Sequence, residues 1–353
     1  MNLTKLEQYV FEGYEEDYDF DKVKNLPKEY MAEAIFEASQ LINYKENTEP
    51  VNILENEDST ENRLAYLKKK INVEEIFKDN SKNLVDFYKK TKYLQYKWFY
   101  NKEGFMHMGL SWDNKFNSSD VYSQIYYIAN RFIDNNTKKV LELGSGQSSN
   151  LSILNLLNKD IKIYGIDMYP PMGMNNNSSN IELITGDYHD LSIFETNSLD
   201  VAFSIESVCY STNKKKLLEE VYRVLKPGGV YVCFDAYSTS LACERSDLRN
   251  EVFELMEKGW RVEKFENIHD WENCINNSGL ELINNRDITN LIKPCLKWLS
   301  SRVKVYTSFP YSLILKYLPK AVLGNTIAGY CILDAVRSGD LGYFLHVMKK
   351  IAM

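Results

Sequence analysis

A glycine turn near residue 145 constrains the fold of this chain more than any other feature. The apolar run that ends at Leu143 passes through Gly144, Ser145 and Gly146 into a segment with helical spacing. Two glycines this close together allow positive φ angles, and they let backbone N–H groups approach a ligand that a Cβ atom would keep away. The stretch therefore predicts a buried strand, a tight turn and a helix that together bind a nucleotide-like cofactor.

The residues around this turn argue against a nicotinamide dinucleotide. The pattern G-x-G-x-x-G requires a third glycine, and Ser149 stands at that position. What remains is Glu142-x-Gly144-x-Gly146, followed by Asp167 at the end of the next apolar segment. A carboxylate there can accept hydrogen bonds from both hydroxyls of a ribose. A ribose-containing cofactor is favoured, although a glycine turn in an ordinary α/β protein remains an alternative.

Together these residues resemble the class I S-adenosylmethionine (SAM) dependent methyltransferases. The resemblance implies that the backbone at Gly144 and Gly146 holds SAM and that Asp167 binds its ribose. Asp187 and Tyr188 follow the third apolar segment. They match the two family positions that bind the adenine amine and flank the adenine ring. The cofactor-binding residues predicted in this way are Glu142, Gly144, Ser145, Gly146, Asp167, Met168, Asp187, Tyr188 and Ile205.

Further segments resemble methyltransferases that act on small molecules. The run Leu218–Gly229 is similar to a segment that small-molecule methyltransferases share. Residues 205–210, Ile-Glu-Ser-Val-Cys-Tyr, resemble the Ile-Glu-Ala-x-Cys-His segment of sterol C-methyltransferases, in which the acidic residue lies beside the acceptor. The aromatic stretch at residues 95–122 resembles the region before the glycine turn in sterol and tocopherol enzymes, but it equally fits a hydrophobic core. The candidate catalytic residues are Glu206, Tyr210, His107 and Tyr100.

The alternation of strand-like and helix-like segments predicts an α/β fold. The resemblance implies a Rossmann-like, mostly parallel sheet of seven strands with an antiparallel last strand. The predicted helices span residues 147–157, 213–225 and 269–277, and residues 246–264 are interpreted as a surface segment. The predicted strands end at residues 143, 167, 185, 205, 235, 288 and 348.

Four regions are predicted along the chain. An N-terminal helical region spans residues 1–95, and the SAM-binding core spans residues 96–289. About 50 residues then separate the last two strands, and a structureless loop of that length is improbable in a compact domain. We therefore expect residues 290–340 to form a helical insertion that acts as a lid or a dimer contact, and residues 341–353 to return to the core as its last strand.

Composition excludes several other classes of function. The net charge is −7 and the basic residues are dispersed, which argues against nucleic-acid binding. The six cysteines lack a C-x-x-C pattern and the four histidines are scattered, so no metal site is predicted. Neither a signal peptide nor a transmembrane segment is recognisable. We expect a cytoplasmic protein that binds a small apolar acceptor and forms a homo-oligomer through the insertion.

Three functions remain open at this point. The first is SAM-dependent methylation of carbon in an apolar, isoprenoid-like or sterol-like molecule. An alkene acceptor of this kind becomes a carbocation, which a carboxylate and aromatic rings stabilise, and the chain contains 25 tyrosines. The second is methylation of oxygen or nitrogen in a small metabolite, which requires a general base. The third is binding of SAM without catalysis.

Overall fold

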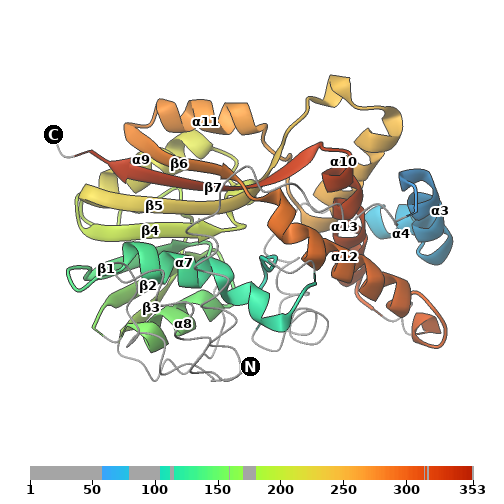
Figure 1. Cartoon of the computed structure of the whole chain (residues 1–353), viewed down its shortest axis with the longest axis horizontal. Coiled ribbons are helices and arrows are strands. Elements are labelled where there is room, and N and C mark those ends of the chain that lie inside the picture. Colours follow the sequence, from blue (N-terminus) through green and yellow to red (C-terminus); the bar gives the residue numbers. More distant parts are fainter. Residues whose placement is uncertain are drawn as a thin grey trace.

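The computed structural model describes residues 58–78, 104–111, 115–158, 160–169, 180–313, 315 and 318–351. It contains a twisted sheet of seven strands with a group of helices beyond one of its ends (Figure 1). The strand order is β3-β2-β1-β4-β5-β7-β6, and β7 runs antiparallel to the other six strands. The predicted Rossmann-like sheet with an antiparallel last strand is therefore confirmed. The strands are β1 (Lys139–Leu143), β2 (Lys162–Asp167), β3 (Ile181–Thr185), β4 (Leu199–Ile205), β5 (Leu225–Ser238), β6 (Leu280–Asp287) and β7 (Leu341–Lys350).

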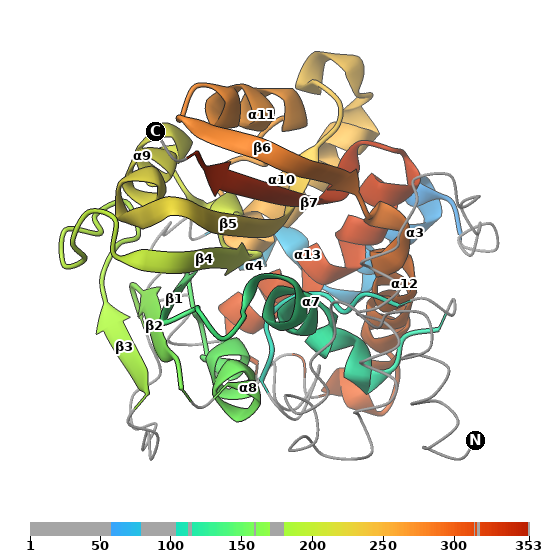
Figure 2. The same ribbon diagram turned by 60° about the vertical axis from the view of Figure 1, so that its left-hand side comes forward.

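Helices cover both faces of the sheet. Helices α7 (Ser123–Phe132) and α8 (Ser149–Leu157) lie on one face, and α9 (Lys214–Val224) and α11 (Ile268–Asn276) lie on the other (Figure 2). Alternate side chains of β5 therefore enter two separate cores, because successive residues of a strand point to opposite faces. Val232 packs in the core that includes α7 and α8, whereas Tyr231 and Cys233 pack in the core that includes α9 and α11.

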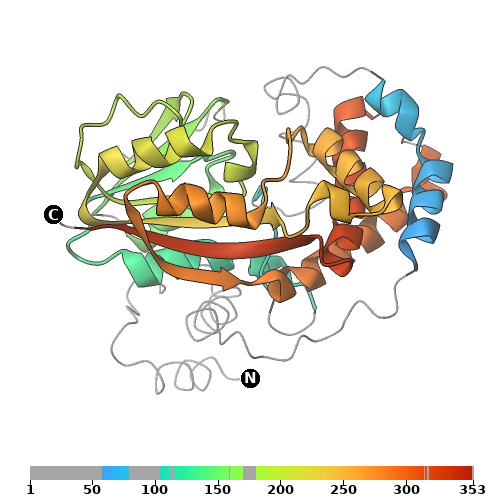
Figure 3. The same cartoon turned by 90° about the horizontal axis from the view of Figure 1, so that it is seen from above.

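A layer of helices lies beyond the carboxyl ends of β4 and β5 (Figure 3). Two of these helices occupy the interval between β6 and β7 for which a helical insertion was predicted, and the turn Tyr311–Leu313 lies between them. Two short helices from the N-terminal region pack against the same layer, and the rest of residues 1–95 lies outside the described residues. The helices of this layer are α3 (Thr60–Lys70), α4 (Val73–Phe77), α10 (Asp247–Trp260), α12 (Thr289–Tyr306) and α13 (Lys320–Arg337).

The interpretation of residues 246–264 as a surface segment was wrong. Most of this segment forms α10, in which Val252, Phe253 and Met256 are buried. Met256 follows Val252 by four residues and Phe253 by three, which is helical spacing. Charged residues make up much of the rest of the segment, so its composition resembles that of an exposed segment. The helix packs tightly against α13, since a Cβ atom on Gly259 would lie 2.4 Å from the carbonyl oxygen of Gly324. The segment is thus part of the interior of the helical layer.

Arg63 ties the N-terminal helix α3 to the rest of the helical layer. The side chain is fully buried, and its Nε lies 2.9 Å from both carboxylate oxygens of Asp334 on α13. Its other nitrogens donate to Ser300 Oγ on α12 and to the carbonyl oxygen of Tyr330, each at 2.8 Å. A buried ion pair is costly to break, because removing one partner leaves an uncompensated charge.

We predict that Arg63→Ala strongly destabilises the protein. The substitution leaves Asp334 buried without its cation, so the free energy of unfolding should fall by about 3–5 kcal/mol. Urea denaturation monitored by circular dichroism measures this change. Lys69→Ala on the exposed side of α3 is the matched control and should change stability little. A loss of less than about 1 kcal/mol, the usual limit for an exposed pair, would show that Arg63 is not such an anchor.

Candidate functional site

A cavity of about 800 Å³ lies between the sheet and the helical layer. The sheet contributes the glycine turn after β1, the end of β2 and the residues that follow β4. Residues 104–108 and helices α10, α12 and α13 contribute the remaining walls. Ligands of open α/β sheets bind outside the carboxyl ends of the strands. The helical insertion therefore lines the same cavity as the glycine turn, and its function as a lid stays a prediction.

The glycine turn has the geometry that its sequence predicts. Gly144 and Gly146 have φ angles of 72° and 50°, which side chains other than glycine rarely adopt. A Cβ atom on Gly144 would lie 2.5 Å from Cβ of Ser207, so the turn passes directly against the residues after β4. At Gly146 an added Cβ would meet only the sulfur of Met106, at 3.4 Å. The backbone at Gly146 is therefore open to the cavity.

Asp167 is hydrogen-bonded to the backbone of the glycine turn. Its Oδ2 accepts from the backbone N–H of Gly146 at 2.9 Å, and its Oδ1 accepts from the N–H of Tyr169 at 2.7 Å. These two bonds fix the carboxylate at the carboxyl end of β2, where it lines the cavity. Each carboxylate oxygen has a second lone pair, so both can still accept from a ligand hydroxyl. Met168, the next residue, also lines the cavity and is largely exposed.

Several buried polar atoms around the turn have no hydrogen-bond partner among the described residues. Asn150 donates to Oε1 of Glu142 at 2.7 Å, but Glu142 Oε2 has no partner. The same holds for Ser145 Oγ and Gln147 Nε2, and all three of these residues line the cavity. Burial raises the pKa of Glu142 to about 8. Buried polar atoms are normally hydrogen-bonded, so this group is suited to a polar ligand.

Asp187 and Tyr188 line the cavity beside the end of β3. Asp187 is half exposed, and its Oδ1 accepts from Nδ1 of His189 at 2.6 Å. The hydroxyl of Tyr188 donates to the carbonyl oxygen of Ser207 at 3.0 Å, which fixes its ring. Ile205, the last residue of β4, lines the cavity as well. His189 was not among the predicted residues, because nothing in its local sequence distinguishes it from a surface histidine.

Glu206 lies at the carboxyl end of β4 and lines the cavity. Its φ angle of 51° is unusual for a residue with a side chain, and such strain is typical of functional sites. Glu206 Oε1 accepts from the backbone N–H of Met108 at 2.7 Å and from the hydroxyl of Tyr343 at 2.9 Å. These contacts hold the carboxylate between residues 104–108 and β7. Tyr343 was missed, because its pairing with β5 depends on a contact across more than 100 residues.

Two carboxylates lie close together in sheet position, half-buried Glu206 directly after β4 and buried Asp235 on the neighbouring strand β5. Asp235 on β5 is 1% exposed, and it accepts from the N–H groups of Cys209 at 3.0 Å and Ala236 at 2.8 Å. Burial raises the pKa of Asp235 to about 6. Burial, together with the negative charge of Asp235, raises the pKa of Glu206 to about 8. The two groups therefore ionise at different pH, as in many acid–base sites. An acidic residue at the end of a predicted strand was the signal that could have found Asp235.

The other candidate catalytic residues have different environments. His107 is 4% exposed, and its ring nitrogens contact the carbonyl oxygen of Met108 and Oδ1 of Asn150. Burial lowers the pKa of His107 to about 4, so the ring is neutral near pH 7. Tyr210 is half-buried and lines the cavity, as does His107. Tyr100 lies outside the described residues. The roles of all four candidates stay predictions.

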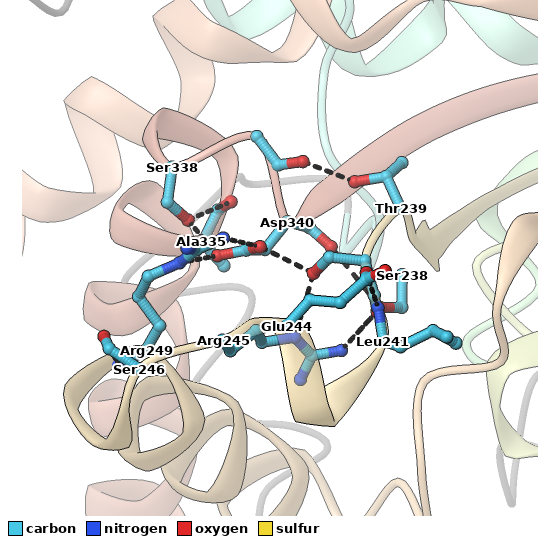
Figure 4. Close-up of polar contacts among 12 residues, drawn as sticks. Ser238, Thr239, Leu241, Glu244, Arg245, Ser246, Arg249, Ala335, Ser338 and Asp340 are labelled. Carbon is cyan, nitrogen blue, oxygen red and sulfur yellow. Dashed lines mark hydrogen bonds and ion pairs between the residues drawn. The ribbon is translucent and has the colours of Figure 1, made fainter.

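Asp340 anchors the helical wall of the cavity to the sheet (Figure 4). Its carboxylate accepts from Ser240 Oγ at 2.6 Å and forms an ion pair with Arg249 of α10. Its carbonyl oxygen accepts from the N–H of Thr239 at 2.8 Å, directly after β5. Arg245 donates to Ser238 Oγ at 2.6 Å beside it. This network joins the end of β5, the start of α10 and the turn between α13 and β7, so it sets where α10 and α13 lie over the cavity.

Comparison with known proteins identifies the domain that contains this cavity. Residues 141–233 match the model of a family described as methyltransferase domain. The chain therefore contains a class I SAM-dependent methyltransferase domain. Such a domain uses SAM as its cofactor. The match includes the glycine turn, Asp167, Asp187 and Glu206.

Relatives of the methyltransferase domain include sterol enzymes. The chain is 27% identical over 190 residues to sterol methyltransferase-like 1 of Botryococcus braunii. This alignment covers 51% of this chain and 45% of that protein. It is 24% identical over 139 residues to the sterol 24-C-methyltransferase of Saccharomyces cerevisiae, which covers 39% of this chain and 36% of that protein. The aligned part thus spans less than half the length of either relative.

Solved structures share the fold of the methyltransferase domain. The cyclase SpnF superimposes with a TM-score of 0.61 at 15% identity over 78% of this chain and 97% of its own. A geranyl diphosphate methyltransferase superimposes with a TM-score of 0.57 at 10% identity over 76% of this chain and 98% of its own. At these identities the likeness shows the fold alone.

The residues around the glycine turn fit SAM. Glu142, Ser145 and Gln147 each have a polar atom without a hydrogen-bond partner among the described residues, and these atoms suit the polar groups of an amino acid and a nucleoside. The open backbone at Gly146 leaves room for those ligand groups. Within the described residues no cluster of His, Cys, Asp and Glu could hold a metal ion. No helix in the same part of the chain is long and apolar enough to cross a membrane.

We predict that Asp167→Asn weakens SAM binding by about 10-fold or more. The substitution removes the charge from a pair of hydrogen bonds to the ribose, and bonds to charged groups contribute about 1.5–3 kcal/mol each. Isothermal titration calorimetry with SAM measures the change. Asp190→Asn, on an exposed loop outside the cavity, is the control. Unchanged SAM affinity in Asp167→Asn would refute the ribose assignment.

Proposed function

We propose that this protein transfers the methyl group of SAM to a carbon atom of an apolar small molecule of isoprenoid or sterol type. The observation that carries the proposal is Glu206, a carboxylate in the same cavity as the SAM-binding turn. Its segment resembles the one that lies beside the acceptor in sterol C-methyltransferases. The names of the relatives, which include a sterol 24-C-methyltransferase, support the same acceptor class.

The residues of this chain have separate tasks in the proposed reaction. SAM supplies an electrophilic methyl group, so the protein mainly aligns the reactants and excludes water. The glycine turn and Asp167 orient the cofactor, and the helical wall gives the acceptor apolar surface from Leu299, Val303 and Leu318. Methylation of one carbon of an alkene places positive charge on the neighbouring carbon of the former double bond. Glu206 then stabilises that charge or takes up the proton that leaves.

The electrostatics of Glu206 suit this task. With a pKa of about 8, the group is mostly protonated near neutral pH when no ligand is bound. A positive charge beside the carboxyl group lowers its pKa and favours the ionised form. In a site shielded from water, the field of that carboxylate on a developing cation is stronger than in bulk solvent. The bonds from Met108 and Tyr343 hold the carboxylate in place before the reaction begins.

Methylation of oxygen or nitrogen is the second candidate function. A general base works best when its pKa is close to the operating pH. The raised pKa of Glu206 fits that role as well as it fits stabilisation of a carbocation. The nature of the product distinguishes the two functions. The expected homo-oligomer, the cytoplasmic location and the absence of nucleic-acid partners stay predictions.

We predict that Glu206→Gln lowers turnover by about 100-fold or more and leaves SAM affinity nearly unchanged. The amide keeps the shape of the side chain but removes its charge, and losing one preorganised electrostatic group costs about this factor. Transfer of a labelled methyl group from SAM to an isoprenoid or sterol acceptor gives the rate. Glu219→Gln, on the exposed side of α9, is the control. Full activity of Glu206→Gln would remove Glu206 from the mechanism.

We predict that Tyr343→Phe shifts the pH profile of turnover toward higher pH. The hydroxyl of Tyr343 donates to Glu206 and lowers the pKa of Glu206. If the ionised form is active, turnover rises with pH through that pKa, and loss of the hydroxyl moves the rise upward. Tyr231→Phe removes another buried hydroxyl, which bonds to Ser204, and should leave the profile in place. An unshifted profile in Tyr343→Phe would contradict the proposed coupling.

A further inference from the structure

Arg302 brings a positive charge into the cavity, and the structure records no counterion for it among the described residues. Arg302 lies on the face of α12 that lines the cavity, together with Leu299, Val303 and Tyr306. Its Nε is buried and has no hydrogen-bond partner in the part of the chain that the structure describes. Within the described residues, no carboxylate oxygen forms an ion pair with it. An unpaired guanidinium in a largely apolar cavity is unfavourable unless a ligand completes its hydrogen bonds.

The position of this guanidinium is fixed before any ligand binds. One of its terminal nitrogens donates to the hydroxyl of Tyr306, one turn further along α12. The guanidinium carbon lies 4.9 Å from the ring centre of Tyr306 and 5.7 Å from that of Trp298, one turn earlier. Cation–π contacts with two rings of the same helix restrict the side chain. Little conformational entropy is then lost when a ligand binds.

The surrounding charges leave the guanidinium uncompensated. Residues 288–333 contain six Lys or Arg residues and no Asp or Glu. Helix α10 and the residues after it contribute Glu254, Glu257 and Glu263 to the cavity lining, and none of these three described residues forms an ion pair with Arg302. Glu254 forms an ion pair with Lys258, and Oε1 of Glu257 accepts from the N–H of Phe265 at 3.0 Å. The electrostatics of the α12 wall therefore favour a negatively charged group.

We propose that Arg302 binds an anionic oxygen group, a carboxylate or a phosphate, at one end of the methyl acceptor. The inference rests on the proposed function and adds a substrate class to it. Arg302 belongs to the helical wall, and Glu206 belongs to the sheet. An acceptor held at both places has its apolar body in the cavity and its anionic end on α12. Guanidinium groups suit such ligands, because their planar donors match carboxylate and phosphate oxygens.

The test compares three ligands that share one apolar chain. Farnesol, farnesoic acid and farnesyl monophosphate are titrated calorimetrically into the full-length protein with S-adenosylhomocysteine present. The acid or the phosphate should bind about 10- to 100-fold more tightly than the alcohol, in line with a charge-assisted hydrogen bond. Arg302→Gln should abolish this preference, and Arg302→Lys should keep part of it. Lys304→Gln removes the same charge from the same helix outside the cavity and should keep the full preference.

Each outcome decides one point. Tighter binding of the acid alone identifies a carboxylate, and tighter binding of the phosphate alone identifies a phosphate. The proposal is overturned if the alcohol binds as tightly as both anions, if no anion binds, or if Arg302→Gln keeps the preference. Binding is measured without turnover, so these results are independent of methyl transfer. Failure of the proposed function would instead appear as normal SAM binding without transfer to any apolar acceptor.

Discussion

The close contact between the glycine turn and the end of β4 determines how the site is assembled. Gly144 passes so near Ser207 that a Cβ atom would lie 2.5 Å from the side chain, and Ser207 Oγ donates to the carbonyl oxygen of Leu143 at 2.6 Å. This contact brings the SAM-binding turn beside Glu206, the residue before Ser207. The proposed cofactor and acceptor residues therefore line one cavity, because two neighbouring parallel strands end at the same edge.

The opposite wall depends on buried polar contacts between segments that are distant in sequence. Arg63 joins α3 to α13 through Asp334 and to α12 through Ser300. Asp340 joins α10 and the end of α13 to β5. Both carboxylates are almost fully buried, so each requires its cation. The two networks fix helices from three separate parts of the chain over the cavity. The proposed acceptor side of the site thus depends on several separate parts of the chain, whereas the proposed cofactor side lies within residues 141–233.

The cofactor half of the site was predictable because its signals are local. The glycine pair, Asp167 and the acidic residue after β4 each follow an apolar strand, and the sheet order follows from the family that these residues resemble. The helical half was only partly predictable. The many charged residues of α10 made its buried face difficult to recognise from the sequence. The contact of Tyr343 with Glu206 depends on pairing between β5 and β7, which are distant in sequence, so no local pattern predicts it. Arg302 gave no signal, because a lone arginine in a helix is usually solvated.

The central claim is that the cavity brings SAM and an apolar acceptor together so that carbon is methylated. The most direct measurement uses SAM labelled with ¹³C in its methyl group, incubated with the protein and a panel of isoprenoids and sterols. The ¹³C NMR spectrum of the product then reports the atom that carries the label. We predict a methyl group bound to carbon in an apolar product. A methyl group bound to oxygen or nitrogen, or recovery of all label in SAM, would contradict the claim.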